Sequence, residues 1–318
     1  MDVRQLKYLI AIAEKRSFAA AAEALGMAQP SLSVQMKNLE HRLGTELFVR
    51  SPRGVTLNEA GEVLLLHAGQ ILHAVEVATN EVREAGRNPS GPVIFGFPSS
   101  ASMVLSVPLA ETIRLEYPDI RLRAVDAMSG FIKEWLEEET IDLALLYETS
   151  GLANAEVRTL LHEELYFYAA PDLWPFDSSL AQPVTLSSIQ NIELVLPSKS
   201  HGLRMLIDQH CKQAGVTLNI VVEMDSLSQI KSLVSRGSAC TILAPAAAND
   251  SETRGELIGA PIVDPVISRP VYLVRNPKRM RTKASAVVEK ATIDVVRELV
   301  ERNIWRGRLD AGALLEGQ

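Results

Sequence analysis

Apolar positions in the first 58 residues recur at the three- and four-residue intervals that are typical of short amphipathic helices. The pattern predicts one helix around residues 6–13 and an alanine-rich second helix over 18–25, which Ser17 can cap at its start. After a tight connection, a third helix is expected from Pro30 to Gly44, because proline suits a first helical turn and glycine suits a helix end.

Two short β-like runs, residues 47–49 and 55–57, flank a turn-prone basic segment that contains Arg50 and Arg53. This arrangement predicts a hairpin with a positively charged tip. A helix, a tight turn, a second helix and a basic hairpin are together typical of a winged helix-turn-helix. In that motif the recognition helix enters the major groove of DNA, and here it is the third helix of the chain.

The third helix carries small hydrogen-bonding groups and one cation on the face opposite Leu32. Such groups suit base edges and nearby phosphates, although an ordinary amphipathic surface helix shows the same pattern. The residues predicted to contact DNA are Ser17, Gln29, Pro30, Ser31, Ser33, Val34, Lys37, Arg50 and Arg53.

Asn58 can cap a long helix that runs to about residue 85, and a linker with glycine and proline follows it. Apolar residues along this helix alternate in steps of four and three, which is the spacing of a coiled-coil seam and predicts a partner helix. Packing against the body of the same chain is the alternative. The predicted dimer interface consists of Leu64, Ala68, Ile71, Val75, Ala78 and Val82.

Beyond residue 92, short apolar runs alternate with helical stretches, which indicates an α/β fold with largely parallel sheets. About 230 residues are large for one such unit, so we expect two lobes. The predicted strands are 93–97, 122–125, 143–146, 165–169, 194–196, 220–222, 241–243 and 271–274, and the predicted helices are 104–115, 131–137, 203–214 and 227–236.

Composition and charge refine this organisation. Of the 318 residues, 47% are hydrophobic and 22% are charged, which is typical of a globular protein and argues against disorder. The net charge is −7, but residues 1–58 carry +3 and the remainder −10. A small basic head on an acidic body is expected where only the head meets phosphate.

Neither a secretory signal nor a membrane span is expected from the sequence. The chain starts without an apolar segment, and its longest stretch free of charged residues, 88–110, contains four prolines. Only two cysteines are present, Cys211 and Cys240, which excludes a disulfide-rich scaffold. We therefore expect a cytoplasmic protein that makes no contact with a membrane.

The head of the chain resembles the LysR-type transcriptional regulators. The resemblance rests on the runs SFAAAAEAL at 17–25, AQPSLS at 28–33, LFVR at 47–50 and VTLNEAG at 55–61. YPDI at 117–120 and IDLA at 141–144 extend it into the body. One departure is Ala28, which stands where the family often has serine or threonine as the cap of the recognition helix.

The resemblance implies three parts: a winged helix-turn-helix over 1–58, a dimerising linker helix over 59–88 and a regulatory domain over 89–318. That last domain is expected to be two-lobed, like periplasmic binding proteins, and to bind a small effector. The implied function is sequence-specific transcriptional regulation. The implied partners are double-stranded promoter DNA, RNA polymerase and further copies of the chain in a homodimer or homotetramer.

Serine-rich segments follow several predicted strands, where open α/β lobes bind their ligands. The effector-binding residues predicted there are Ser99, Ser100, Ser129, Ser198, His201 and Thr241. The serines either bind a small polar ligand or only cap helices. Lys199, His201 and Arg204 could supply charge, and for Arg204 an interlobe salt bridge is the alternative.

No catalytic, metal-binding or cofactor-binding motif is recognisable in the sequence, and the six histidines are scattered. We therefore expect neither an enzyme nor a bound metal or cofactor. Buried inert thiols are favoured over a redox pair for Cys211 and Cys240. The alternatives are a ligand-binding protein whose head no longer binds DNA, and a regulator without effector whose body serves only oligomerisation. An enzyme built on a binding-protein-like body is the least favoured.

Overall fold

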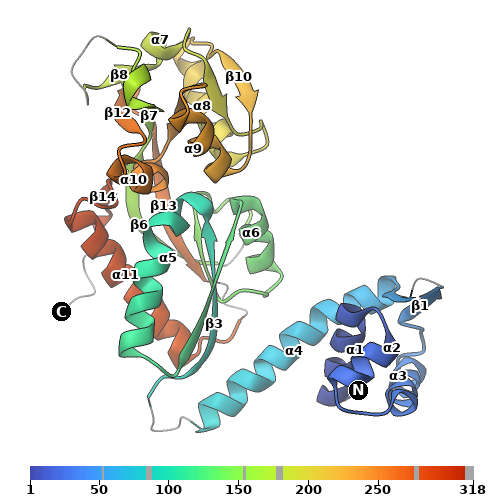
Figure 1. Ribbon diagram of the computed structural model, residues 1–318. Helices are drawn as coiled ribbons and strands as arrows, with labels where there is room; N and C mark the ends of the chain where they lie inside the picture. Colours follow the sequence, from blue (N-terminus) through green and yellow to red (C-terminus); the bar gives the residue numbers. More distant parts are fainter. Residues whose placement is uncertain (52–53, 84–87, 153–154, 177–181, 276–278, 312–318) are drawn as a thin grey trace. The chain divides into compact units, whose positions relative to one another are not determined.

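The computed structural model divides into two compact units (Figure 1). It describes residues 1–318 except 52–53, 84–87, 153–154, 177–181, 276–278 and 312–318. The first unit comprises residues 1–87 with 138–140, and the second comprises 88–137 and 141–318. In the described parts of both units, no helix is long and apolar enough to cross a membrane.

The first unit contains three short helices, a hairpin and one long helix. Its elements are α1 (Val3–Lys15), α2 (Phe18–Ala24), α3 (Gln29–Leu43), β1 (Phe48–Ser51), β2 (Gly54–Leu57) and α4 (Glu59–Arg83). Ser17 caps α2, as its side chain accepts a hydrogen bond from the Ala20 N–H at 3.4 Å. Gly44 ends α3 in the left-handed region that favours glycine. The predicted winged helix-turn-helix is confirmed.

The core of this unit holds α3 in place. Leu32, Met36 and Leu39 form the buried face of α3 and belong to one cluster with the buried residues of α1. Ala68 of α4 is fully buried in the same cluster. The first part of α4 therefore closes the core of its own head, and the opposite face of α3 is left at the surface.

The first lobe of the second unit is built on a six-stranded mixed sheet in the order β14-β6-β13-β5-β3-β4. Strands β3 and β4, and β3 and β5, are parallel, whereas β13 runs antiparallel to both β5 and β6. The elements are β3 (Gly91–Pro98), α5 (Ser99–Glu116), β4 (Ile120–Ala127), α6 (Ser129–Glu137), β5 (Leu143–Leu146), β6 (Glu156–Glu164), β13 (Ser268–Arg275), α11 (Lys283–Glu301) and β14 (Arg308–Leu309).

The second lobe contains a four-stranded sheet, β11-β7-β12-β8, and the parallel pair β10-β9. A parallel bridge between Leu194 and Cys240 connects the pair to this sheet. The elements are β7 (Tyr166–Ala169), η1 (Pro171–Leu173), β8 (Val184–Thr185), α7 (Leu186–Ile189), β9 (Leu194–Leu196), α8 (Gly202–Ala214), β10 (Ile220–Glu223), α9 (Leu227–Ser235), β11 (Thr241–Leu243), α10 (Pro245–Thr253) and β12 (Ile258–Val263).

The chain passes between the lobes along two extended connections, from β6 into β7 and from β12 into β13 (Figure 1). Each lobe has its own hydrophobic core. Helix α10 links them, because Ala247 is buried in the second core and Ala246 in the first. The predicted α/β fold with two lobes is confirmed, but the sheets are mixed rather than largely parallel, since β6, β7 and β13 run antiparallel to their neighbours.

Candidate DNA-binding and effector-binding sites

The exposed face of α3 presents most of the residues predicted to contact DNA. Gln29, Pro30, Ser31, Val34 and Lys37 are exposed, and Ser33 is half-buried. Val34 shows 55% of its surface to solvent and adds an apolar group to this face. This face combines hydrogen-bonding groups, one cation and one exposed apolar side chain, which is a combination that can contact phosphates, base edges and thymine methyl groups.

The start of α3 has no side-chain cap. Ala28 occupies the N-cap position and forms no capping hydrogen bond, as its methyl side chain requires. The predicted loss of a hydroxyl cap is therefore confirmed. Ser17 lies at the start of α2, half-buried, with its oxygen already engaged by the helix.

The wing is tied to the first helix of the head. In the hairpin, β1 and β2 pair antiparallel, with Arg50 opposite Val55. The Val55 N–H donates to the backbone oxygen of Arg16 at 2.9 Å, directly after α1. Arg53 and the side chain of Arg50 lie outside the described residues.

The predicted seam on α4 divides into two parts. Leu64 and Ile71 pack partly buried against the head core, and Ala68 is fully buried in it. The assignment of Ala68 to a dimer interface is therefore wrong, because its own chain already encloses the side chain. Further along, Val75 is 41% exposed and Val82 is 79% exposed, and Ala78 is exposed as well.

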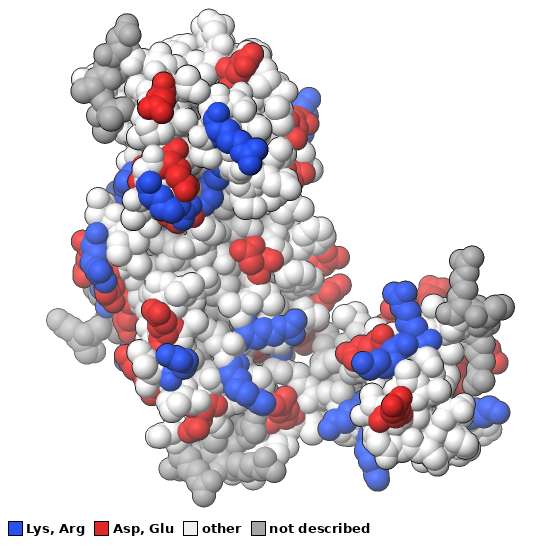
Figure 2. Space-filling model, viewed as in Figure 1, with Lys and Arg blue, Asp and Glu red and all other residues white. Residues whose placement is uncertain are grey.

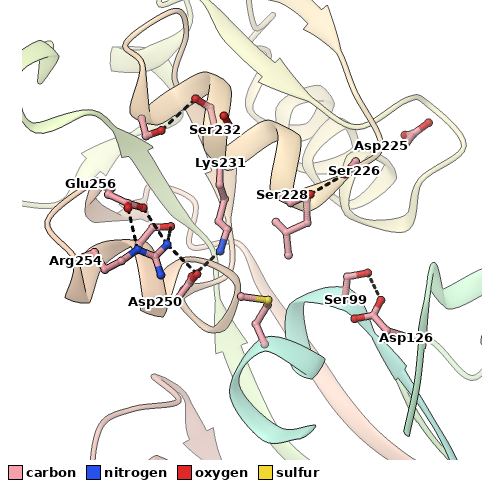
Figure 3. Close-up of a pocket in the computed structure, with 14 residues that line it drawn as sticks. Ser99, Asp126, Asp225, Ser226, Ser228, Lys231, Ser232, Asp250, Arg254 and Glu256 are labelled. Atoms are coloured by element: carbon pink, nitrogen blue, oxygen red, sulfur yellow. Dashed lines mark hydrogen bonds and ion pairs between the residues drawn. The ribbon is translucent and has the colours of Figure 1, made fainter. Parts of the chain in front are cut away.

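A pocket of about 600 Å³ opens between the two lobes of the body (Figure 3). The first lobe contributes the start of α5 and the end of β4, and the second contributes the segment before α9, α9 itself, and α10 with the residues that follow it. The lining residues are Ser99, Met103, Asp126, Asp225, Ser226, Leu227, Ser228, Lys231, Ser232, Ser235, Asp250, Ser251, Arg254 and Glu256.

One side of the pocket carries a chain of alternating charges. Lys231, only 8% exposed, forms an ion pair with Asp250 at 2.5 Å. Arg254 lies 3.1 Å from Asp250 and 2.8 Å from Glu256. Burial opposes ionisation of Asp250, yet the hydrogen bonds and charges of Lys231 and Arg254 outweigh it, so the pKa of Asp250 is lowered.

The other side of the pocket carries two carboxylates from different lobes. Ser99 donates from its hydroxyl to Asp126 at 2.6 Å, which connects α5 to the end of β4. Asp225 accepts a hydrogen bond from the Ser198 N–H at 2.9 Å, and its pKa is lowered mainly by hydrogen bonds from Ser198. His201 caps α8 through Nδ1, which accepts from a backbone N–H, and burial lowers its pKa.

Of the residues predicted to bind an effector, Ser99 lines this pocket. The Ser100 hydroxyl lies 2.5 Å from that of Tyr147 and 3.2 Å from the Arg269 guanidinium. Thr241 is fully buried and donates to the Val195 carbonyl, so its predicted role in the effector site is wrong. Ser129 begins α6, Ser198 supplies its N–H to Asp225, and His201 caps α8.

Arg204 does not form the interlobe salt bridge that was the alternative for it. It is buried and pairs with Asp208 and Glu223 inside the second lobe.

The sequence left several polar residues of the pocket unassigned. The carboxylate of Asp126 and the ion pair of Lys231 with Asp250 were not foreseen. For Asp126 a signal was present, since an acidic residue directly follows the predicted strand 122–125.

The described residues contain no group of three or more His, Cys, Asp or Glu side chains that could hold a metal ion.

On the face shown in Figure 2, Lys and Arg side chains project from the head, and both signs of charge are interspersed over the body.

Comparisons with known proteins identify the family of both parts of the chain. Residues 3–62 match the family described as bacterial regulatory helix-turn-helix protein, lysR family, and residues 86–294 match the LysR substrate binding domain. The nitrogen assimilation regulatory protein nac of Escherichia coli is 32% identical over 249 residues, 78% of this chain and 80% of that protein. The transcriptional dual regulator GltC of Bacillus subtilis is 30% identical over 289 residues, 90% of this chain and 94% of that protein.

Solved structures show the same fold along almost the entire chain. Full-length CbnR in complex with its target DNA has a TM-score of 0.71 at 22% identity and covers 94% of this chain and 99% of that one. A mutant of Corynebacterium glutamicum OxyR has a TM-score of 0.60 at 26% identity and covers 95% and 94%. The chain belongs to the LysR family of transcriptional regulators and combines a DNA-binding helix-turn-helix with an effector-binding domain.

Proposed function

We propose that this regulator reads promoter DNA with the exposed face of α3 and is controlled by a small effector that binds in the pocket between the lobes. The observation that carries the effector part is the pocket itself, because both lobes contribute polar groups to its lining. The division into residues 1–58, 59–88 and 89–318 is part of this proposal, as are the absence of enzymatic activity and a contact with RNA polymerase.

The DNA part rests on α3. Its buried face is fixed by the head core, so Gln29, Ser33 and Lys37 are held in a constant orientation at the surface. Such a helix can dock as a rigid reader, with side chains that bind bases and phosphates. Removing Lys37 should weaken binding to all DNA sequences. If Lys37 contacts one phosphate, the slope of log affinity against log salt concentration should also become less steep by about 0.9.

A gel-shift titration over a range of salt concentrations tests this with Lys37→Ala in the full chain. Lys212→Ala is the matched control, since it removes the same charge from an exposed site at the end of α8 in the body. An unchanged slope for Lys37→Ala, together with unchanged affinity, would remove this residue from the DNA interface.

The oligomer part rests on the second half of α4. Val75, Ala78 and Val82 leave an exposed apolar strip on one helix, which a second copy of the helix can cover. Val75→Asp should therefore dissociate subunits that pair through α4, because a buried unpaired carboxylate is strongly unfavourable. Sedimentation of the full chain measures this, with Val63→Asp as a control at an exposed position beside the seam. An intact dimer in Val75→Asp would contradict this pairing.

If the effector binds in this pocket, a change in the pocket should alter the response to effector without altering DNA binding in its absence. A ligand that touches both lobes stabilises one relative lobe position, and this change can be transmitted to DNA binding. Ser99→Ala should weaken the response to effector but preserve effector-free DNA binding, because Ser99 lies in the pocket and not in the head. A thermal-shift screen of small metabolites, followed by calorimetry on both proteins, tests it. A lowered melting temperature with unchanged ligand affinity would show that Ser99 only supports the fold.

A further inference from the structure

The charges around the interlobe pocket are unevenly neutralised. Four carboxylates and two cations line it. Both cations are already engaged, as Lys231 pairs with Asp250 and Arg254 pairs with Asp250 and Glu256. Among the described residues, no ion pair joins a cation to Asp126 or Asp225, which therefore give the pocket a surplus of negative charge.

These two carboxylates come from different lobes. Asp126 lies near the end of β4 in the first lobe, and Asp225 lies between β10 and α9 in the second. Figure 3 shows both on the same side of the pocket, Asp225 above on the second lobe and Asp126 with Ser99 below on the first. Both residues are exposed, so a ligand that enters the pocket can reach their free lone pairs.

The two carboxylates lie beside backbone positions that could attract an anion. The N-terminus of α5 opens at Ser99, and Ser99 donates its hydroxyl to Asp126 at 2.6 Å. In the second lobe, the Ser198 N–H donates to Asp225 at 2.9 Å. Free N–H groups and helix N-termini attract anions, but here the chain supplies its own negative groups beside them. An anionic effector would meet carboxylates at both places.

The neighbouring imidazole of His201 does not reverse this field. His201 is close enough to Asp225 to influence it, but burial lowers the pKa of His201, so its imidazole is neutral near pH 7. Hydrogen bonds from Ser198 lower the pKa of Asp225, so that carboxylate stays charged. The field in this part of the pocket is negative at neutral pH.

We propose that the effector is an organic cation whose ammonium or guanidinium group is held between Asp126 of the first lobe and Asp225 of the second. This rests on the proposed binding of an effector in the pocket. The two carboxylates repel each other when the lobes approach, and a cation between them replaces repulsion by attraction. The cation therefore favours the closed arrangement of the lobes, which couples binding to a change in shape.

Calorimetry on the full chain with four molecules built on one carbon skeleton tests the proposal. Agmatine and 1,4-diaminobutane carry cationic groups, butanedioate is the matched anion and 1,4-butanediol is the matched neutral molecule. We expect heat of binding and a raised melting temperature with the two cations only. The affinity should fall as salt concentration rises, because the attraction is screened.

The variants Asp126→Asn and Asp225→Asn locate the site. Asparagine keeps an oxygen that can accept the hydrogen bonds from Ser99 and Ser198, so the fold should be preserved. Each variant should weaken binding of the cations by about tenfold or more, which is typical for loss of a charge-assisted hydrogen bond. Glu116→Gln is the control, since it removes one exposed charge at the other end of α5.

Each other result overturns the proposal. Binding of butanedioate or butanediol in preference to the cations, with affinity lost in Ser99→Ala, would keep the effector pocket but refute the cationic class. Cation binding that survives both asparagine variants would place the ligand elsewhere. No binding of either cation at millimolar concentration would refute the cationic class, while other ligands found by the metabolite screen would leave the effector pocket itself intact.

Discussion

The body contains two polar clusters that use similar residues in opposite ways. In the closed cluster, between β6 and β13, the buried residues Glu163, Arg269 and Trp305 are joined by the half-buried Ser100 and Tyr147. The open cluster consists of the charged residues that line the pocket: Asp126, Asp225, Lys231, Asp250, Arg254 and Glu256. The closed cluster has its charged groups bound by other parts of the chain. The open cluster leaves the carboxylates of Asp126 and Asp225 available. The closed cluster can therefore hold the connection between the lobes in place, while the open cluster can bind a ligand.

The closed cluster is assembled from distant parts of the chain. Arg269 donates from Nε to Glu163 at 2.8 Å, and its guanidinium lies 3.5 Å from the centre of the Tyr147 ring. The Trp305 indole donates to the second oxygen of Glu163 at 2.8 Å. Burial raises the pKa of Tyr147 to about 12, so its hydroxyl remains a hydrogen-bonding group and carries no charge.

The largest effect is expected from Glu163→Ala. This change leaves the Arg269 guanidinium and the Trp305 N–H buried without their acceptor. Removing one partner of a buried ion pair typically costs about 3–5 kcal/mol of the free energy of unfolding. Denaturant unfolding of the full chain, followed by circular dichroism, measures the loss.

Glu256→Ala is the matched control in the open cluster. Its carboxylate pairs with Arg254, but both side chains are about half exposed, so water replaces the lost partner. The unfolding free energy should stay nearly unchanged. Equal losses in Glu163→Ala and Glu256→Ala would erase the distinction between the two clusters.

The next effect concerns single hydrogen bonds. Trp305→Phe keeps an aromatic ring but removes the donor to Glu163, which should cost about 1.5–3 kcal/mol because the acceptor is charged. Trp174→Phe is the control, since the Trp174 indole nitrogen is buried with no hydrogen-bond partner among the described residues. The melting temperatures of the two variants are compared with that of the unchanged protein, and Trp305→Phe should show the larger decrease. A larger loss for Trp174→Phe would contradict the assigned role of the Trp305 donor.

These clusters also mark what the sequence can and cannot predict. The strands 143–146, 194–196 and 241–243 were predicted with the bounds that β5, β9 and β11 have, because each is a short buried apolar run. Strand β6 was missed, since only three of its nine residues are apolar and its buried Glu163 cannot be told from a surface carboxylate in the sequence. The partners that stabilise Glu163 lie 106 and 142 residues away, beyond the reach of any local pattern.

Helix α4 shows a different limit. The spacing of Leu64, Ala68 and Ile71 continues without change into Val75, so one pattern predicted one partner-facing seam. The structure uses its first part for the core of the head. A repeat of four and three residues specifies that one face is buried, but the surface that covers the face depends on the tertiary structure. The same holds for the pocket, where Ser99 was predicted but its partner Asp126 was not.

A smaller loss of stability is expected when the ion pair between Lys231 and Asp250 is removed. Lys231→Met removes the buried partner of Asp250, whose pKa is lowered in the folded protein. A carboxyl group with a lowered pKa contributes stability above its unfolded pKa, and this contribution is lost as pH falls through the folded value. The variant should be less stable by about 1 kcal/mol at neutral pH, since Asp250 is partly exposed and keeps Arg254.

The pH dependence makes this prediction specific. Unfolding curves of the two proteins should differ at neutral pH. They should converge only after the pH has fallen through the lowered folded pKa of Asp250, which lies below the usual aspartate value, because Asp250 is then protonated in both proteins. Arg254→Met is the variant for comparison, because the exposed guanidinium of Arg254 contacts the same carboxylate of Asp250. A stability difference that stays constant down to acidic pH would show that Lys231 acts through packing and not through its charge.

The smallest effect is expected when the two cysteines are exposed to a thiol reagent, because both thiols are buried and remain neutral. Burial raises the pKa of Cys211 and of Cys240 to about 11, and for Cys211 the nearby Asp208 adds to the shift. The thiolate is the reactive form, and at pH 7 its fraction is then on the order of one in ten thousand. An aromatic disulfide reagent should therefore leave both thiols unmodified in the folded protein and react with both in guanidinium chloride, with Cys211→Ser and Cys240→Ser assigning the signals. Rapid modification of either thiol under native conditions would mean that its part of the second lobe opens to solvent, and the contrast between a closed interior and an open pocket would then not extend to that core.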